Sequence, residues 1–385
     1  MAFAFVSFAH GLGMGRRLAA GPSRCTDQTA RVNTSARGPS NSALIIMHNS
    51  ARLVPFLALA AFVAVSAVRA QPLGLDLVSS RQIWSAAPHN AFTDLARFRD
   101  RWWCTFREGD GHVGGDGKIR VLVSTDGDRW ASAALLEEKG VDLRDPKFSV
   151  TPDGRLMLSL GGSVYEGKTL KDRQPRVAFS ADGREWTAPR RIMERGDWLW
   201  RVTWREGRAL GISYRSPIAA RDPAEWTVQL VESTNGIDYR LVTSLDVPGR
   251  PNEGTVRFRE NGDALALLRR EGADKAAWIG ESRPPYRQWQ WRPAGLFIGG
   301  PNFLELPGGA LVAGGRQMQP APQGPRMFLG HMTAGAVTPE LFLPSGGDCS
   351  YPGLVWHDGF LWVSYYSSHE GRSAIYLAKV RVPVP

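Results

Sequence analysis

The sequence predicts an all-β fold, a six-bladed β-propeller of four-stranded antiparallel blades, and three observations lead to this prediction. A seven-residue turn motif starts again 56 and then 53 residues after its first copy. Six strand–turn–strand segments follow one another at intervals of roughly 50 residues. The 385 residues include 42 Gly, 26 Pro and 14 Trp, with few long helical patterns. This composition favours many short strands joined by tight turns.

The turn motif occupies Ser124–Trp130, Ser180–Trp186 and, more weakly, Ser233–Tyr239. Each copy follows a run rich in β-branched residues and precedes another apolar segment. In such a hairpin loop the Asp or Asn accepts local backbone hydrogen bonds, and the Gly adopts a positive φ. A fixed period in the tens of residues is typical of a repeat architecture. A β-sandwich with insertions is the alternative fold, and it does not explain the repeat.

The six segments also predict which side chains meet. Seven residues after each turn the second strand is ending, at positions that carry three Arg and two Tyr: Arg107, Gly161, Tyr214, Arg269, Arg316 and Tyr366. The first strands have an end on the same face, and there they bring Arg144, Asp145, Arg250, Glu253 and Tyr351. Equivalent strand ends converge in a radial fold, so we expect these side chains to surround one mouth of the central channel. The alternative is that the arginines only mark the solvent boundary of each strand.

The N-terminal region divides into two parts that do not belong to the fold. Residues 1–46 are rich in Gly, Ser, Arg and Ala without periodicity, so we expect a non-structured or over-called extension. Residues 47–70 combine a basic start, an apolar run and small residues before Gln71, which is typical of a secretory signal peptide. The apolar run is too short to predict a membrane span. We therefore expect a single domain at 71–385 that is secreted or periplasmic and not inserted in the membrane after cleavage.

Charge and cysteine content limit the possible partners. The formal net charge is +10, but seven Arg and one Asp before residue 71 account for +6 of it. Because no basic run follows, nucleic acid is not an expected partner, and the remaining excess of Arg suits either an anionic ligand or a solvated surface. Cys104 and Cys349 fall in the first and last blades, where buried free thiols or one disulfide are both compatible with the sequence. We expect a monomer without a cofactor or metal motif.

Three segments resemble the sialidase superfamily over residues 83–383. The turn motif resembles the Asp box, which lies away from the catalytic face in that family. Residues 253–269 are similar to the family segment in which a Glu assists the catalytic Tyr and an Arg grips the substrate carboxylate, and residues 350–366 are similar to the segment with the nucleophilic Tyr. The resemblance implies that Tyr351 is the nucleophile, Glu253 its partner and Asp116 the general acid/base. It further implies carboxylate binding by Arg269 and, on position alone, by Arg316.

One departure from that family concerns the substrate. The first strand of the first blade reads His89–Leu95 and lacks the Arg that completes the family's three-arginine clamp, so Arg107 or Arg144 would have to reach the pocket. An acidic sugar other than sialic acid is therefore a possible substrate. The predicted substrate-binding residues are Arg107, Arg144, Asp145, Arg250, Arg269, Arg316 and Tyr366.

The expected function is that of a retaining exo-glycosidase that removes a terminal acidic sugar from a glycan. A Tyr nucleophile is the sialidase exception to the usual pair of carboxylates, because a neutral phenol avoids repulsion by an anionic sugar. Two other functions remain open: a propeller polysaccharide lyase that uses Tyr or His as the base, with His89 and His112 available, and a non-catalytic carbohydrate-binding propeller. Asp116 could also be only a turn cap, Glu253 a structural ion pair, and Tyr351 a cover for the core.

Overall fold

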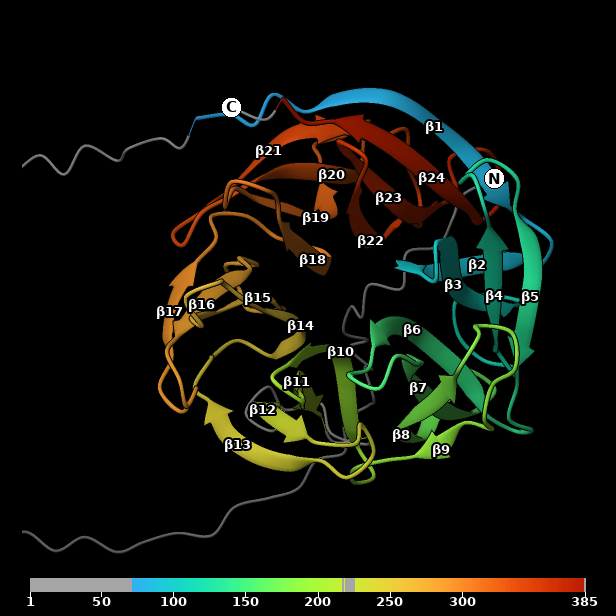
Figure 1. Ribbon diagram of the computed structural model, residues 1–385. Helices are drawn as coiled ribbons and strands as arrows, with labels where there is room; N and C mark the ends of the chain where they lie inside the picture. The colour runs from blue at the N-terminus through green and yellow to red at the C-terminus, as the bar shows by residue number, and fades with distance from the viewer. Residues whose placement is uncertain (1–70, 217, 219–225, 384–385) are drawn as a thin grey trace, which may run out of the picture. The chain divides into compact units, whose positions relative to one another are not determined.

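The computed structural model describes residues 71–216, 218 and 226–383, and the regular secondary structure in these residues is all β-strand. The strands form six four-stranded antiparallel sheets. Figure 1 shows these sheets arranged radially, with one strand of each beside the central channel. The predicted six-bladed all-β propeller is therefore confirmed. The predicted extension and signal peptide lie outside the described residues.

Each blade begins with the strand beside the channel and continues outward. Blade 1 contains β2 (His89–Phe98), β3 (Arg101–Gly109), β4 (Lys118–Ser124) and β5 (Ala131–Leu136). Blade 2 contains β6 (Asp142–Val150), β7 (Leu156–Glu166), β8 (Thr169–Ser180) and β9 (Arg190–Arg191). Blade 3 contains β10 (Asp197–Arg205), β11 (Arg208–Arg215), β12 (Thr227–Ser233) and β13 (Arg240–Leu245). Blade 4 contains β14 (Pro251–Phe258), β15 (Ala264–Arg270), β16 (Trp278–Ser282) and β17 (Gln290–Pro293). Blade 5 contains β18 (Gly299–Glu305), β19 (Leu311–Met318), β20 (Pro325–Met332) and β21 (Val337–Phe342). Blade 6 contains β22 (Ser350–His357), β23 (Phe360–Ser367), β24 (Ala374–Arg381) and, as its outer strand, β1 (Asp76–Trp84).

The repeated turn motif joins the third and fourth strands of blades 1, 2 and 3. In the first copy, Ser124 Oγ accepts a hydrogen bond from the Gly127 amide at 2.8 Å, and Asp126 Oδ1 accepts from the amides of residues 128 and 129 at 2.7 and 2.9 Å. Gly127 has φ 76°, a conformation that side chains disfavour. The indole of Trp130 donates to the Gly127 carbonyl at 3.0 Å, which closes the loop. The copies that start at Ser180 and Ser233 repeat the Ser and Asp or Asn contacts.

A two-residue irregularity in each inner strand shapes the channel. Between the first and second strands of every blade, two residues of the inner strand lie opposite one residue of its partner, so the register shifts by one residue. Such bulges bend a strand and re-aim its side chains. The first of the two bulged residues in each inner strand is Phe92, Asp145, Trp200, Asn252, Gly300 or Tyr351, and four of these have positive φ angles of 50–66°. The propeller thus repeats one bent position six times around the channel, where side chains from different blades meet.

Buried polar contacts also join the inner strands of different blades. Arg201 of β10 binds both carboxylate oxygens of Asp94 in β2 at 2.9 Å, so a buried ion pair joins blades 3 and 1. Thr93 donates a hydrogen bond to the Tyr351 carbonyl at 2.7 Å, between blades 1 and 6. These contacts join the strands that carry the bent positions, which supports their arrangement around the channel.

The ring closes between the two ends of the described chain. Strand β1 pairs with β24 along its length, and Arg381 lies 3.1 Å from Asp76. Cys104 and Cys349 are both buried and free, so the structure has the two thiols and not the disulfide. Among the residues that the structure describes, none forms a helix with the length and apolar character needed to span a bilayer.

Candidate active site

The candidate site is built around a hydrogen bond between two blades. Tyr351, at the start of β22, donates its phenol proton to Glu253 Oε1 across 2.6 Å, and Glu253 lies at the start of β14. Arg269 Nη1 lies 3.0 and 2.9 Å from the two oxygens of the same carboxylate. The Gly300 amide donates to Glu253 Oε2 at 2.8 Å. The carboxylate thus accepts from three residues that belong to blades 4, 5 and 6.

The electrostatics of this pair keep the proton on the phenol. Burial by itself would raise the pKa of Glu253, but the Arg269 charge and the hydrogen bonds from Tyr351 and Arg269 outweigh it and hold this pKa below its ordinary value. Burial, together with the nearby Glu253 charge, raises the pKa of the Tyr351 phenol well above its ordinary range. The resting state is therefore a neutral phenol that faces an anionic acceptor. This is the arrangement of a nucleophile with its general base.

Aromatic side chains fix the position of Tyr351. Its ring stacks on Tyr366 with 5.9 Å between centroids and meets the edge of Phe92 at 5.1 Å. The ring of Trp200 from blade 3 lies 5.3 Å away. Tyr351 and Glu253 retain 8% and 7% of their exposure, so the pair borders the channel and is not sealed inside a blade. Aromatic rings thus pack around Tyr351, while the Tyr351–Glu253 pair keeps a small exposure to solvent.

Gly300 allows this packing. Its φ is 62°, and a Cβ at this position would lie 2.6 Å from Ser350 Oγ and 3.0 Å from two ring atoms of Tyr351. Any side chain here would therefore push against the Tyr351 ring while the backbone is already in the left-handed region. The residue lets the backbone approach closely enough for its amide to bind Glu253.

Asp145 supplies a second carboxyl group near the pair. It occupies the bent position of β6 with φ 50° and is 9% exposed. Burial raises its pKa, Glu253 adds to this effect, and Arg144 and Lys147 oppose it without cancelling it. Its Oδ1 has no hydrogen-bond partner among the described residues. A buried carboxyl group with an unpartnered oxygen and a raised pKa is suited to hold and deliver a proton.

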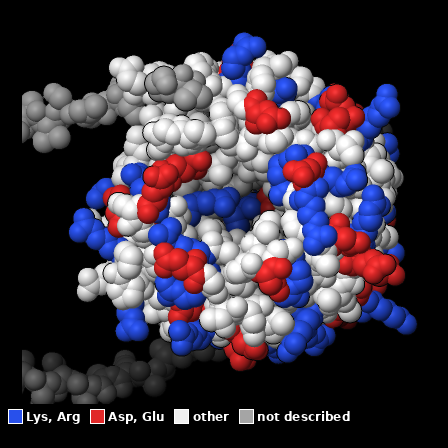
Figure 2. Space-filling model, viewed as in Figure 1, with Lys and Arg blue, Asp and Glu red and all other residues white. Residues whose placement is uncertain are grey.

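Basic side chains lie around these carboxyl groups. Lys147 Nζ lies 5.4 Å from the ring centre of Tyr351, and burial, reinforced by Arg201, lowers the pKa of this amine to about 8. The Arg144 guanidinium lies 4.8 Å from the ring centre of Phe92. Figure 2 shows basic side chains inside the central hollow of this face. The environment is therefore compatible with an anionic ligand, although each cation has an acidic neighbour.

Arg316 and Tyr366 occupy the side of the site nearest blades 5 and 6. Tyr366 is fully buried and donates its hydroxyl to Asp348 Oδ1 at 2.8 Å. Arg316 Nη1 lies 4.0 Å from the same oxygen, and the Arg316 side chain is 20% exposed. Its Nε is buried without a hydrogen-bond partner among the described residues. Arg316 thus combines a partly exposed side chain with a nitrogen that no described group binds.

The structure corrects the expectation for Arg107. Its side chain is fully buried: Nε donates to Asp142 Oδ1 at 2.5 Å, and Nη1 donates to the Gly111 carbonyl at 2.7 Å. The alignment placed Arg107 at the end of β3 as expected, but a carboxylate from the neighbouring blade binds it. Arg107 therefore holds the loop after β3 in place and does not face a ligand.

Asp116 and Arg250 are both exposed and have no contact with Tyr351 or Glu253 among the hydrogen bonds and ion pairs of the described residues. Asp116 is exposed and accepts a hydrogen bond from the Gly140 amide at 2.9 Å, which is the turn-capping role considered above. It lines a shallow hollow of about 350 Å³ in blade 1, together with Lys118 and Glu108. Arg250 is exposed, with φ 54°. The geometry favours Asp145 over Asp116 as the carboxylic acid of the site.

Comparison with known proteins defines first the class of fold. At the level of sequence, no family model and no curated protein matches the chain. Solved structures match over most of it, and they share the six-bladed propeller architecture. Because the identities are below 20%, these matches show the fold alone.

Three solved structures illustrate this likeness. A protein of unknown function from Dyadobacter fermentans has a TM-score of 0.69 at 19% identity, over 80% of this chain and 99% of its own. The Trypanosoma rangeli sialidase in complex with the inhibitor DANA has a TM-score of 0.60 at 12% identity, over 80% of this chain and 59% of its own. An α-L-arabinofuranosidase from Fusarium graminearum, in complex with an iminosugar inhibitor, has a TM-score of 0.60 at 14% identity, over 79% and 98%.

Proposed function

We propose that this protein is a retaining glycosidase that uses Tyr351 as its nucleophile. The observation that carries this proposal is the 2.6 Å hydrogen bond from the buried Tyr351 phenol to Glu253, a carboxylate held as an anion. Two of the solved structures with the same fold are a sialidase and an arabinofuranosidase, which supports a carbohydrate substrate. Fold alone does not assign an activity, so the proposal depends on the side chains.

The proposed reaction has two steps. Tyr351 Oη attacks the anomeric carbon while its proton passes to Glu253 Oε1, and Asp145 donates a proton to the departing glycosidic oxygen. In the second step Asp145 accepts a proton from water, which attacks the anomeric carbon and breaks its bond to Tyr351 Oη, while Glu253 returns its proton to that oxygen. Arg269 holds Glu253 in position for the first transfer. The balance of protons requires Asp145 to begin as an acid, in line with its raised pKa.

We further propose an acidic sugar as the substrate. A neutral phenol approaches an anomeric carbon that bears a carboxylate without the repulsion that an anionic nucleophile would meet. Arg316 is the cation best placed to bind that carboxylate, because its Nε is unpartnered among the described residues and the side chain reaches solvent. The first strand of the first blade offers no Arg at this site, and its Phe92 packs on Tyr351. Simple sialosides are therefore expected to be poor substrates.

The experiment is a screen of the purified protein against acidic and neutral glycosides, with product masses as the readout. A hydrolysed acidic sugar is the expected product, and a fluorinated analogue of it should leave a covalent mass on the peptide that contains Tyr351. An unsaturated, ultraviolet-absorbing product would instead identify a polysaccharide lyase. Binding without any product would identify a carbohydrate-binding propeller.

A further inference from the structure

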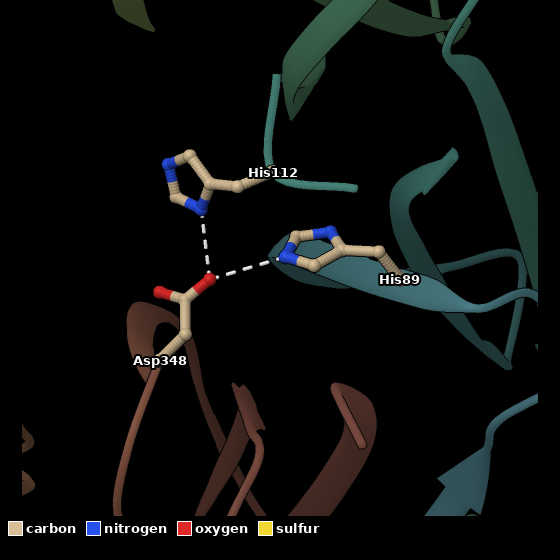
Figure 3. Close-up of side chains that lie close together, drawn as sticks. All are labelled: His89, His112 and Asp348. Atoms are coloured by element: carbon tan, nitrogen blue, oxygen red, sulfur yellow. Dashed lines mark hydrogen bonds and ion pairs between the residues drawn. The ribbon is translucent and has the colours of Figure 1, made fainter. Parts of the chain in front are cut away.

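A second group of side chains lies beside the proposed active site, at the junction of the first and last blades. His89 begins β2, His112 belongs to the loop between β3 and β4, and Asp348 lies in the loop before β22. The two imidazoles and the carboxylate each offer one ligand atom, and these atoms lie within 4.8 Å of one another. Figure 3 shows both rings directed at the same carboxylate group from different sides. The glycosidase proposal uses none of the three.

The contacts show that nitrogens, and not ring carbons, face the common point. His89 Nε2 lies 3.1 Å from Asp348 Oδ2, and His112 Nδ1 lies 2.8 Å from the same oxygen. Around a tetrahedral zinc ion with bonds of about 2.0–2.2 Å, neighbouring ligand atoms are roughly 3.3 Å apart. The two nitrogen–oxygen contacts are a few tenths of an ångström shorter than this value, and all three ligand atoms lie within 4.8 Å of one another, so small rotations of the side chains would bring the set to coordination distances.

Surrounding contacts hold the ligands as they do around metal centres, where a second layer of hydrogen bonds orients the first. Tyr366 donates to the other oxygen of Asp348 at 2.8 Å, which leaves Oδ2 free to face the two rings. Arg144 donates to the backbone carbonyl of His112 at 2.8 Å and anchors its loop. The His112 and Asp348 side chains are 50% and 30% exposed, so an ion can enter and further coordination positions face solvent.

We propose that His89, His112 and Asp348 bind one divalent transition-metal ion of the zinc type. Two imidazole nitrogens and one carboxylate suit such ions better than Mg²⁺ or Ca²⁺, which prefer oxygen ligands. The ion links blades 1 and 6, because two ligands come from one blade and the third from the other. This assignment is independent of the glycosidase proposal. Short spacing motifs do not indicate the site, because more than 230 residues separate His112 from Asp348.

The test is equilibrium dialysis of the chelator-treated protein against micromolar Zn²⁺, with bound metal counted by mass spectrometry. We expect one equivalent in the unaltered protein, and its loss in His89→Ala and in His112→Ala. His112 is half exposed, so its variant is expected to fold, and circular dichroism checks this. His331→Ala, which changes a half-buried histidine on β20, is the matched control and should retain the ion.

Two further readouts make the outcome decisive. Co²⁺ in place of Zn²⁺ should give the intense visible absorption of a low-coordinate nitrogen–oxygen site in the unaltered protein and not in His112→Ala. Zn²⁺ should raise the melting temperature of the unaltered protein and leave that of His112→Ala unchanged, because only a bound ion stabilises the folded state. The absence of stoichiometric binding, or binding that persists in both histidine variants, would overturn the proposal and leave a simple hydrogen-bonded cluster.

Discussion

The replacement Tyr351→Phe separates a catalytic hydroxyl from a structural one. The change removes the 2.6 Å hydrogen bond to Glu253 and keeps the ring that packs on Phe92 and Tyr366. Glu253 keeps its contacts with Arg269 and the Gly300 amide, so its carboxylate is not left without partners. A lost hydrogen bond to a charged group costs about 1.5–3 kcal/mol. If the hydroxyl only positioned its neighbours, turnover would therefore fall by roughly 10- to 150-fold.

Loss of the nucleophile itself predicts a much larger effect. We expect kcat of Tyr351→Phe to fall by about four or more orders of magnitude, because the covalent route is closed. The melting temperature is expected to fall by only a few degrees, since about 2 °C or less corresponds to each kcal/mol in a domain of this size. The assay is single-turnover hydrolysis of the best substrate from the glycoside screen, with Tyr365→Phe as the control that removes a different buried hydroxyl. A loss below 10²-fold, or a covalent adduct that forms in the Phe variant, would refute the assignment of Tyr351.

Three other predictions follow from the same geometry. Asp145→Asn should reduce hydrolysis of sugar-linked substrates by about 10²–10⁴-fold, spare the first turnover of aryl glycosides with good leaving groups, and abolish the alkaline limb of the pH profile. Activity should fall at high pH because Asp145, whose pKa is raised, must be protonated, and at low pH because Glu253, whose pKa is lowered, must be ionised. An unchanged alkaline limb in Asp145→Asn would argue against Asp145 as the acid. Arg316→Ala should weaken binding of acidic substrates by roughly 10- to 150-fold and leave neutral ones unaffected, and Arg381→Ala at the far end of β24 is the control; equal losses on both classes would remove the case for an acidic sugar. Gly300→Ala should destabilise the fold by about 1–3 kcal/mol more than Gly359→Ala. Both glycines have positive φ, but only a Cβ at residue 300 would contact Tyr351 and Ser350, so equal melting temperatures of the two variants would contradict this prediction.

The sequence was sufficient for the architecture because the repeat is local. Turn chemistry at Ser124–Trp130 and its copies, with the hairpins between them, determines each blade from a few neighbouring residues. The alignment also brought Tyr351, Glu253 and Arg269 onto one face, where the structure joins them by hydrogen bonds. Equivalent positions of the six blades meet at the central channel, so a correct alignment of the repeats predicts which residues lie close together.

The same alignment could not predict the direction of each side chain. Arg107 has the expected position in β3, but Asp142 on the next blade binds it, and a partner from another blade leaves no local signal. Asp116 lies in a glycine-rich loop, and the loop path places its carboxylate on the Gly140 amide. The bent positions of the inner strands were also not predicted. They explain why Asp145, and not Asp116, faces the centre.

The closure of the ring has a consequence for how the chain acquires its structure. Asp76 and Arg381, 305 residues apart, contact each other across the β1–β24 pair. During synthesis on the ribosome, β1 must wait for the last strand before its edge is covered. Pairings of such large sequence separation form slowly, and an unpaired strand edge invites association with other chains. Holdase chaperones that shelter residues 76–84 would therefore be expected to improve the yield of folded protein more than faster synthesis.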